Sequence, residues 1–328
     1  MYLTPIATGN TVSNWNTVSC WNWSAPTSEG TSQTEWNDFY GVASTDVDRI
    51  QSTFSGTYQY DQFYIGHTNF TFNDPARDSG YSPGKGFCDL IHTKVMAKRV
   101  KDAGMKLLLD FHYSDFWADP GHSYKPAAWK DLNFEDLKKA MYDYTYSVMN
   151  ELKQQGTLPD MVQVGNEINH GFVWPEGSIS HIDSLAQLIN AGIAAIKAVD
   201  PTMPIMLHVA LGGQNDEAVF FMDNMLKRAV HFDVIGLSYY PKWHGTLDDL
   251  RDNMNDLVRR YNKDIIVVEY SQQKEAVNKL VFELPNGKGK GSCIWEPLNT
   301  WESVFNKDGK SNDYLKRYDE ISKKYLHQ

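Results

Sequence analysis

The sequence predicts an α/β protein and, more specifically, a (β/α)8 or TIM barrel. From about residue 61 to residue 295, apolar strand-like runs alternate with segments whose apolar residues recur every three or four positions. This alternation is typical of a parallel sheet covered by helices. Polar residues end nearly every predicted strand, as a ring of loops at a barrel mouth requires. An open doubly wound sheet is the alternative, but no glycine-rich phosphate turn follows any strand.

Seven short apolar runs are predicted as strands. They lie at residues 61–70, 105–110, 161–167, 204–208, 232–239, 264–269 and 292–295. The first 60 residues diverge from this rhythm and are rich in Thr, Ser, Asn and Trp, although 17–21 alternates like a strand and 46–54 has a helical pattern. We expect this N-terminal segment to supply the first strand and helix, so that residues 1–328 form a single barrel domain.

The segments between the strands carry apolar residues at helical spacing. Asn133 and Thr246 each precede such a segment and can cap its helix. Gly104 and Pro201 stand where a helix has to end. The predicted helices cover residues 91–100, 134–152, 185–196, 217–228, 247–261, 275–282 and 313–326.

Composition excludes several classes of function. The formal charge is −10 and lysines and arginines form no long block, so nucleic-acid binding is not expected. No apolar run approaches the length of a membrane span. The three cysteines, Cys20, Cys88 and Cys293, are too few and scattered for a zinc site or a disulfide framework, although one bridge is possible. We expect no metal, no cofactor and a monomer, and the N-terminus shows no secretion signal.

Two glutamates end buried strands. Glu167 closes the run MVQVGNE at 161–167, and Glu269 closes DIIVVE at 264–269. These are the fourth and seventh predicted strands of the ring, so the two side chains can face each other across the mouth. Retaining glycosidases need such a pair, one carboxyl as proton donor and the other as nucleophile, about 5 to 5.5 Å apart. The pattern predicts a retaining glycosidase.

Residues near the other strand ends are candidate substrate contacts. Asn166 is placed to bind a sugar hydroxyl, and His112 and His208 could bind a hydroxyl or orient a carboxylate. Indole and phenol rings stack on the apolar faces of sugars, and the ten tryptophans are unusually many. Tyr239 and Tyr240 are alternatives for a hydroxyl that supports the nucleophile. The remaining candidates in the strand-following loops are Asp115, Trp117, Trp174, Trp243 and Trp295.

These motifs resemble the arabinogalactan endo-β-1,4-galactanases of glycoside hydrolase family 53. The resemblance extends from about residue 85 to residue 300. It implies that Glu167 is the acid/base, that Glu269 is the nucleophile, that the substrate is β-1,4-galactan of pectic side chains, and that the protein acts outside the cell or at its surface. It is carried by LLLDFHYSDFWADP (107–120), GNEI (165–168), WPEG (174–177), DVIGLSYYP (233–241), VVE (267–269) and WEP (295–297).

Two alternatives depend on departures from the family pattern. The family usually has an arginine-rich second strand, where this chain has HTNFTF at 67–72, and a longer loop than the one after Glu269. Because these segments line the subsites, the same chemistry could act on another β-linked glycan. A protein that binds glycans without cutting them, with catalysis lost alongside the arginine, is the other alternative.

Overall fold

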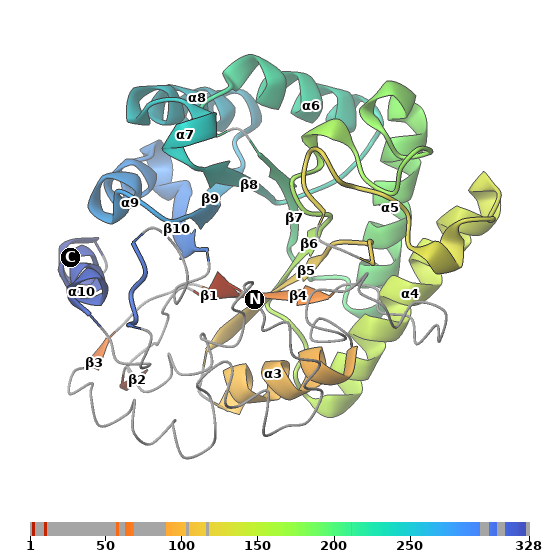
Figure 1. The fold of residues 1–328 in the computed structure, drawn as a ribbon, viewed down its shortest axis with the longest axis horizontal. Coiled ribbons are helices and arrows are strands. Elements are labelled where there is room, and N and C mark those ends of the chain that lie inside the picture. The colour runs from red at the N-terminus through yellow and green to blue at the C-terminus, as the bar shows by residue number, and fades with distance from the viewer. Residues whose placement is uncertain are drawn as a thin grey trace.

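The computed structural model describes residues 90–102, 105–115, 118–210, 212–295, 302–306 and 312–325, together with short strands nearer the N-terminus (Figure 1). The predicted strand at 17–21 and helix at 46–54 lie outside the described residues, as do Cys20, Cys88 and Trp117. A two-stranded antiparallel sheet pairs β2 (Asn10–Thr11) with β3 (Thr57–Tyr58).

The main sheet is curled and parallel, and its strands follow one another in chain order. All seven strands predicted from residue 61 onward are confirmed, and each pairs in parallel with the next. They are β4 (Phe63–Thr68), β5 (Lys106–Phe111), β6 (Met161–Val164), β7 (Ile205–Val209), β8 (Val234–Tyr239), β9 (Asp264–Tyr270) and β10 (Gly289–Ile294).

The N-terminal strand of this sheet differs from the expectation of a parallel eighth strand. β1 (Tyr2–Leu3) joins the sheet beside β4 but runs antiparallel to it. Two residues carry no periodicity, so neither the position nor the direction of this strand could be predicted from the sequence.

Helices lie outside the curled sheet (Figure 1). Two of them begin at the residue that the sequence predicts: Asn133 accepts a hydrogen bond from the backbone of Asp136 before α4, and Thr246 and Asp249 form a capping box at α8. The helices are α3 (Leu90–Asp102), α4 (Phe134–Gln155), α5 (Ile182–Val199), α6 (Asn215–Lys227), α7 (Pro241–His244), α8 (Leu247–Tyr261), α9 (Lys274–Phe282) and α10 (Asp313–Tyr325).

Helix α5 is the most apolar of the described helices. With the short turn before it, Ile179–Val199 is long and apolar enough to cross a membrane, judged by length and composition alone. Its apolar positions, among them Leu188, Ile189 and Ile196, are fully buried in the core shared with α4 and the sheet. A core helix accounts for this pattern.

The strands present alternate residues to two cores. Outward residues such as Leu107 and Leu109 join the large core beneath the helices. Inward residues form a separate apolar layer inside the barrel, contributed by the strands β5 to β10: Leu108, Met161, Met206, Val234, Ile266, Val268 and Cys293. Further inward positions toward the C-terminal strand ends include the polar residues Asp110, Gln163, His208 and Ser238, and these residues form the floor of the candidate site.

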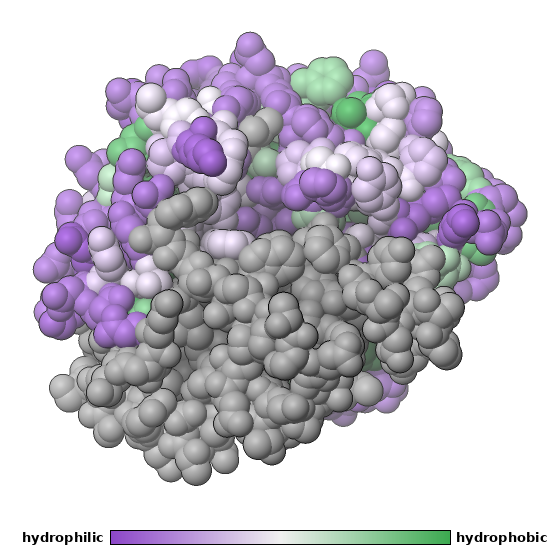
Figure 2. Space-filling model, viewed as in Figure 1, coloured by the Kyte–Doolittle hydropathy of each residue, from purple (hydrophilic) through white to green (hydrophobic). Residues whose placement is uncertain are grey.

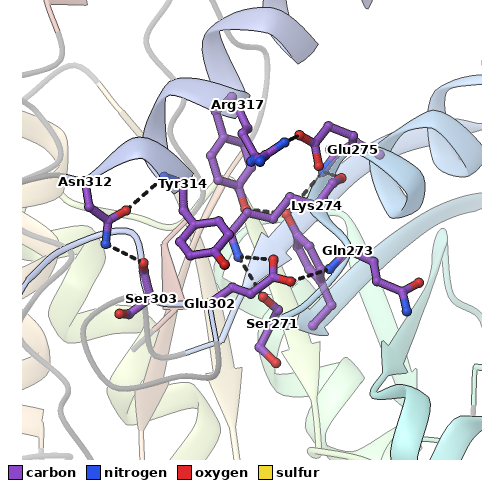
Figure 3. A network of polar contacts seen from close by, with 12 residues as sticks. Ser271, Gln273, Lys274, Glu275, Glu302, Ser303, Asn312, Tyr314 and Arg317 are labelled. Atoms are coloured by element: carbon purple, nitrogen blue, oxygen red, sulfur yellow. Dashed lines mark hydrogen bonds and ion pairs between the residues drawn. The ribbon is translucent and has the colours of Figure 1, made fainter.

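The C-terminal helix is fastened to the loop that follows β9 (Figure 3). Lys274 is fully buried and donates to the Ser271 carbonyl at 2.7 Å and to the Glu302 carboxylate at 3.1 Å. Arg317 on α10 forms an ion pair with Glu275 on α9. These contacts connect α10 to the strand that carries Glu269.

Candidate active site

Glu167 and Glu269 meet at the C-terminal ends of β6 and β9. One carboxylate oxygen of each, together with a ring nitrogen of His208, lies within 4.8 Å of the others. Only 9% of Glu167 and 6% of Glu269 is exposed, so both carboxyls are largely removed from bulk water. The separation fits the close spacing of a retaining pair and is too short for the 6.5 to 9.5 Å of an inverting one.

Irregular backbone brings both side chains to this place. β6 ends at Val164, and Gly165 (φ +85°) and Glu167 (φ +49°) are both left-handed, which turns Glu167 away from the strand direction. In β9 the pairing with β8 steps from Val267 directly to Glu269, so the residue between them forms a bulge. Strict alternation would put Glu269 on the same face as Val267, and the bulge re-aims it into the mouth.

A layer of buried polar side chains supports Glu167. Ser238 donates its hydroxyl to Glu167 Oε1 at 2.5 Å, and its oxygen lies 2.8 Å from His208 Nε2. His208 Nδ1 lies 3.1 Å from Gln163 Nε2. Asn166 donates to the Ala118 carbonyl at 2.9 Å, which uses one of its two amide hydrogens and leaves the other for a ligand.

Tyr240 supports Glu269. Its hydroxyl donates to Glu269 Oε2 at 2.9 Å. The backbone N–H of Tyr240 donates to His244 Nδ1 at 3.1 Å, which fixes the start of this loop. Tyr239 points the other way, into the outer core, and its hydroxyl donates to the Gly245 carbonyl. Of the two tyrosines that the sequence left open, the structure brings Tyr240 to the nucleophile candidate.

Burial controls the titration of the pair. It raises the pKa of Glu167 to about 7, opposed by the Ser238 hydrogen bond. It also raises the pKa of Glu269 well above its usual value, and the charge of Glu167 adds to this while Tyr240 opposes it. Because two like charges this close repel each other, the pair retains a proton near neutral pH. One protonated and one ionised carboxyl is the state that a retaining mechanism starts from.

Aromatic rings border the site on the Glu269 side. Trp295 and Trp243 lie edge-on to Tyr240, with ring centroids 6.3 and 6.0 Å away. Trp243 is 51% exposed. In the loop after β6, Trp174 packs edge-on against the exposed Tyr124. Among the residues coloured by hydropathy in Figure 2, most are hydrophilic.

Three other sequence candidates are engaged in internal contacts. His208 is fully buried. Of the two roles expected for it, binding a sugar hydroxyl or orienting a carboxylate, burial leaves the second. His112 is 2% exposed, accepts a hydrogen bond from Ala118 N at Nδ1 and contacts Asp110 at 3.0 Å through Nε2. Asp115 accepts from the backbone of Ala127 at 2.7 Å. The contacts of Asp110 and Asp115 and the hydrogen bond of His112 shape the loop that lies beneath the mouth of the barrel.

The sequence interpretation missed Ser238, Gln163 and Asp110. Each is buried at 1% exposure or less and lies on the inward face of its strand, above the apolar layer. Period-two alternation could have found Asp110 and Gln163, which lie two residues after the inward Leu108 and Met161. On β8 the small Gly236 between Val234 and Ser238 hides the same signal.

The grouping of Glu167, His208 and Glu269 has the composition of a metal site. Both ring nitrogens of His208 are, however, hydrogen-bonded to Ser238 and Gln163. A metal-ligating imidazole needs one free lone pair directed at the ion. The histidine therefore fits a supporting role beneath the carboxylates.

Comparison with known proteins identifies the family. The model of glycosyl hydrolase family 53 matches residues 70–280, which include both glutamates. The chain belongs to glycosyl hydrolase family 53. Membership implies a carbohydrate substrate.

Relatives of this family 53 chain include enzymes with galactanase names. An uncharacterized Niallia circulans protein is 43% identical over 66% of this chain and 70% of its own length. The arabinogalactan endo-β-1,4-galactanase A of Emericella nidulans is 35% identical over 57% of the chain and 56% of the enzyme. The endo-β-1,4-galactanase of Bacillus subtilis is 35% identical over 61% and 46%. The chain thus spans about half the length of the galactanases.

Solved structures agree with the fold. The Ignisphaera aggregans family 53 catalytic domain superposes with a TM-score of 0.74 at 30% identity, covering 84% of this chain and 87% of that one. A fungal β-1,4-galactanase structure gives 0.69 at 27% identity, with 78% and 87% covered. A Penicillium canescens endo-1,4-β-xylanase gives 0.57 at 12% identity over 91% and 92%, a likeness of fold alone.

Proposed function

We propose that this family 53 chain is a retaining endo-β-1,4-galactanase. The observation that carries the proposal is the buried carboxylate pair, with oxygens within 4.8 Å, at the ends of β6 and β9. In this proposal residues 1–328 form one catalytic domain that acts as a monomer outside the cell. The galactanase names of the relatives support the choice of glycan.

The geometry supplies each step of a double displacement. Glu167 protonates the glycosidic oxygen while Glu269 attacks the anomeric carbon from the opposite face, forming a glycosyl-enzyme. Glu167, now ionised, then removes a proton from the water that displaces Glu269. The hydroxyl of Tyr240 holds the Glu269 carboxylate, and Trp295 offers its ring to the sugar beside it.

Incubation with β-1,4-galactan and with other pectic and hemicellulosic glycans tests the proposal. We expect new reducing ends from β-1,4-galactan, released with the β configuration. If new reducing ends come only from a different β-linked glycan, the proposed substrate is wrong and the proposed mechanism stands. Binding without release of reducing ends would identify a glycan-binding protein and overturn the enzymatic proposal.

Azide rescue tests the role of each glutamate. In Glu167→Ala, azide attacks the glycosyl-enzyme from the face of the lost acid/base, so we expect a β-glycosyl azide. In Glu269→Ala, azide replaces the nucleophile, so we expect an α-glycosyl azide. Glu135→Gln is the matched control, because that side chain is 79% exposed on α4. The reverse pattern of products would exchange the two roles.

A further inference from the structure

Nδ1 of His208 lies within hydrogen-bond reach of two donors and one acceptor. The Gln163 amide nitrogen at 3.1 Å and the Glu167 backbone N–H at 3.4 Å are donors. The Asn166 Oδ1 atom, at 3.0 Å, is an acceptor, and Gln163 Nε2 also reaches it at 3.3 Å. The two amide hydrogens of Gln163 can therefore serve Nδ1 and Asn166 together. When Nδ1 carries a lone pair, both amide hydrogens of Gln163 and the Glu167 N–H have acceptors, and Gln163 Oε1 is the atom of this group left without a hydrogen-bond partner.

The tautomer of His208 then determines the direction of the bonds above it. With Nδ1 unprotonated, Nε2 carries the hydrogen and donates to Ser238 Oγ at 2.8 Å. The single hydroxyl hydrogen of Ser238 is left to donate to Glu167 Oε1 at 2.5 Å. Both His208 and Ser238 have no exposed surface, so protein groups supply these bonds.

We infer that Ser238 and His208 are positioning residues, which together hold Oε1 of Glu167 as a permanent acceptor and so keep the transferable proton on Oε2. The inference deepens the proposed function and rests on it. A hydrogen bond of 2.5 Å is typical of O–H···O⁻ pairs, so the same hydroxyl stabilises Glu167 once it has given up its proton. The pair thus assists both the acid step and the base step.

The other charged groups around Glu167 act against its ionisation. Asp110 on β5 and Asp119 in the following loop raise the pKa of Glu167 by repulsion. Glu269 lies opposite on β9. Ser238 is the side chain whose hydrogen bond lowers that pKa, while His112 and His244 lie near enough to His208 to disfavour its charged form. Removal of the Ser238 hydroxyl should therefore move the titration of Glu167 upward.

The test compares Ser238→Ala with Ser292→Ala. Ser292 is an equally buried serine on β10 that donates to Asn278 at 2.9 Å, away from Glu167. In Ser238→Ala we expect the basic limb of the kcat/KM profile to move up by about one pH unit. On substrates limited by the base step we also expect kcat to fall about tenfold, with KM falling in proportion because the glycosyl-enzyme accumulates. Ser292→Ala should leave both unchanged.

Spectroscopy separates this inference from the proposed function. Nitrogen-15 NMR should show His208 as the neutral Nε2–H tautomer, and carboxyl carbon-13 NMR should show a higher titration midpoint for Glu167 in Ser238→Ala. Neither measurement needs a substrate. His208→Gln, which keeps a donor toward Ser238, should recover part of the activity that His208→Leu loses. An Nδ1–H tautomer, or equal profiles in the two serine variants, would overturn the inference even if galactan is cleaved.

Discussion

Replacing Glu167 by Gln should stabilise the protein while it removes activity. An unfolded glutamate ionises near pH 4.5, and burial raises the pKa of Glu167 to about 7 in the folded state. Between these values the folded protein keeps a proton that the unfolded chain has released. Folding stability therefore falls as the pH rises through this window, and the full cost is present above pH 7.

The size of the effect follows from the shift. This difference between the folded and unfolded pKa of Glu167 costs the wild-type protein about 3 kcal/mol of folding stability at pH 8, and almost nothing below pH 4. In a chain of 328 residues, removing this cost in Glu167→Gln should raise the unfolding temperature by about 4 °C. Gln keeps an oxygen for the Ser238 hydroxyl, so that bond is not lost with the charge. Glu269 also loses its charged neighbour, which acts in the same direction.

Thermal unfolding of both proteins at pH 4 and pH 8 measures this difference. We expect matching unfolding temperatures at pH 4 and a more stable Glu167→Gln at pH 8. Glu135→Gln, exposed on α4, should follow the wild-type protein at both pH values. A variant that is equally shifted at both pH values, or less stable at pH 8, would refute the view that Glu167 carries an unfavourable buried charge.

Three further substitutions test other contacts. Tyr240→Phe removes the hydrogen bond to Glu269, so the pKa of Glu269 should rise. The acidic limb of the kcat/KM profile should then move to higher pH, and turnover should fall about tenfold. An unchanged pH profile would contradict this. Lys274→Met leaves Glu302 without its buried partner and should cost about 3 kcal/mol in chemical denaturation, whereas a loss below about 1 kcal/mol would show that the pair contributes little. Gly165→Ala forces a side chain into a left-handed position with its Cβ 2.5 Å from a neighbouring side chain, so we expect destabilisation of about 2 kcal/mol or more with loss of activity, and wild-type thermal unfolding would contradict that strain.

Apart from the four-residue α7, the strands and helices after residue 90 could be predicted because each has a local signal. The run at 264–270 contains four consecutive β-branched residues, and the helix at 247–261 has both an apolar face and a capping residue. The carboxylate pair could also be predicted, because a glutamate directly after a buried run has few structural explanations. The direction of the N-terminal strand could not, since a pair of residues has no period.

The choice between Tyr239 and Tyr240 shows where local patterns stop. Alternation within β8 puts Val234, Gly236 and Ser238 inward, and so Tyr239 outward, but the small Gly236 hides this pattern in the sequence. In β9 the alternation is broken by the bulge between Val267 and Glu269. A bulge depends on the partner strand, so the sequence of one strand does not reveal it.

The site occupies positions that a barrel could otherwise fill with apolar residues. Asp110, Gln163 and Ser238 lie on the inward face of their strands, above an apolar layer, and are as deeply buried as that layer. A buried polar side chain costs stability unless it is hydrogen-bonded. The chain of bonds from the Gln163 amide nitrogen through His208 to Ser238 meets that condition for these groups, while Gln163 Oε1 has no hydrogen-bond partner. The larger core between sheet and helices is built from apolar side chains that need no hydrogen-bond partners. The polar layer can therefore be specialised for the two carboxylates while the outer core maintains the fold.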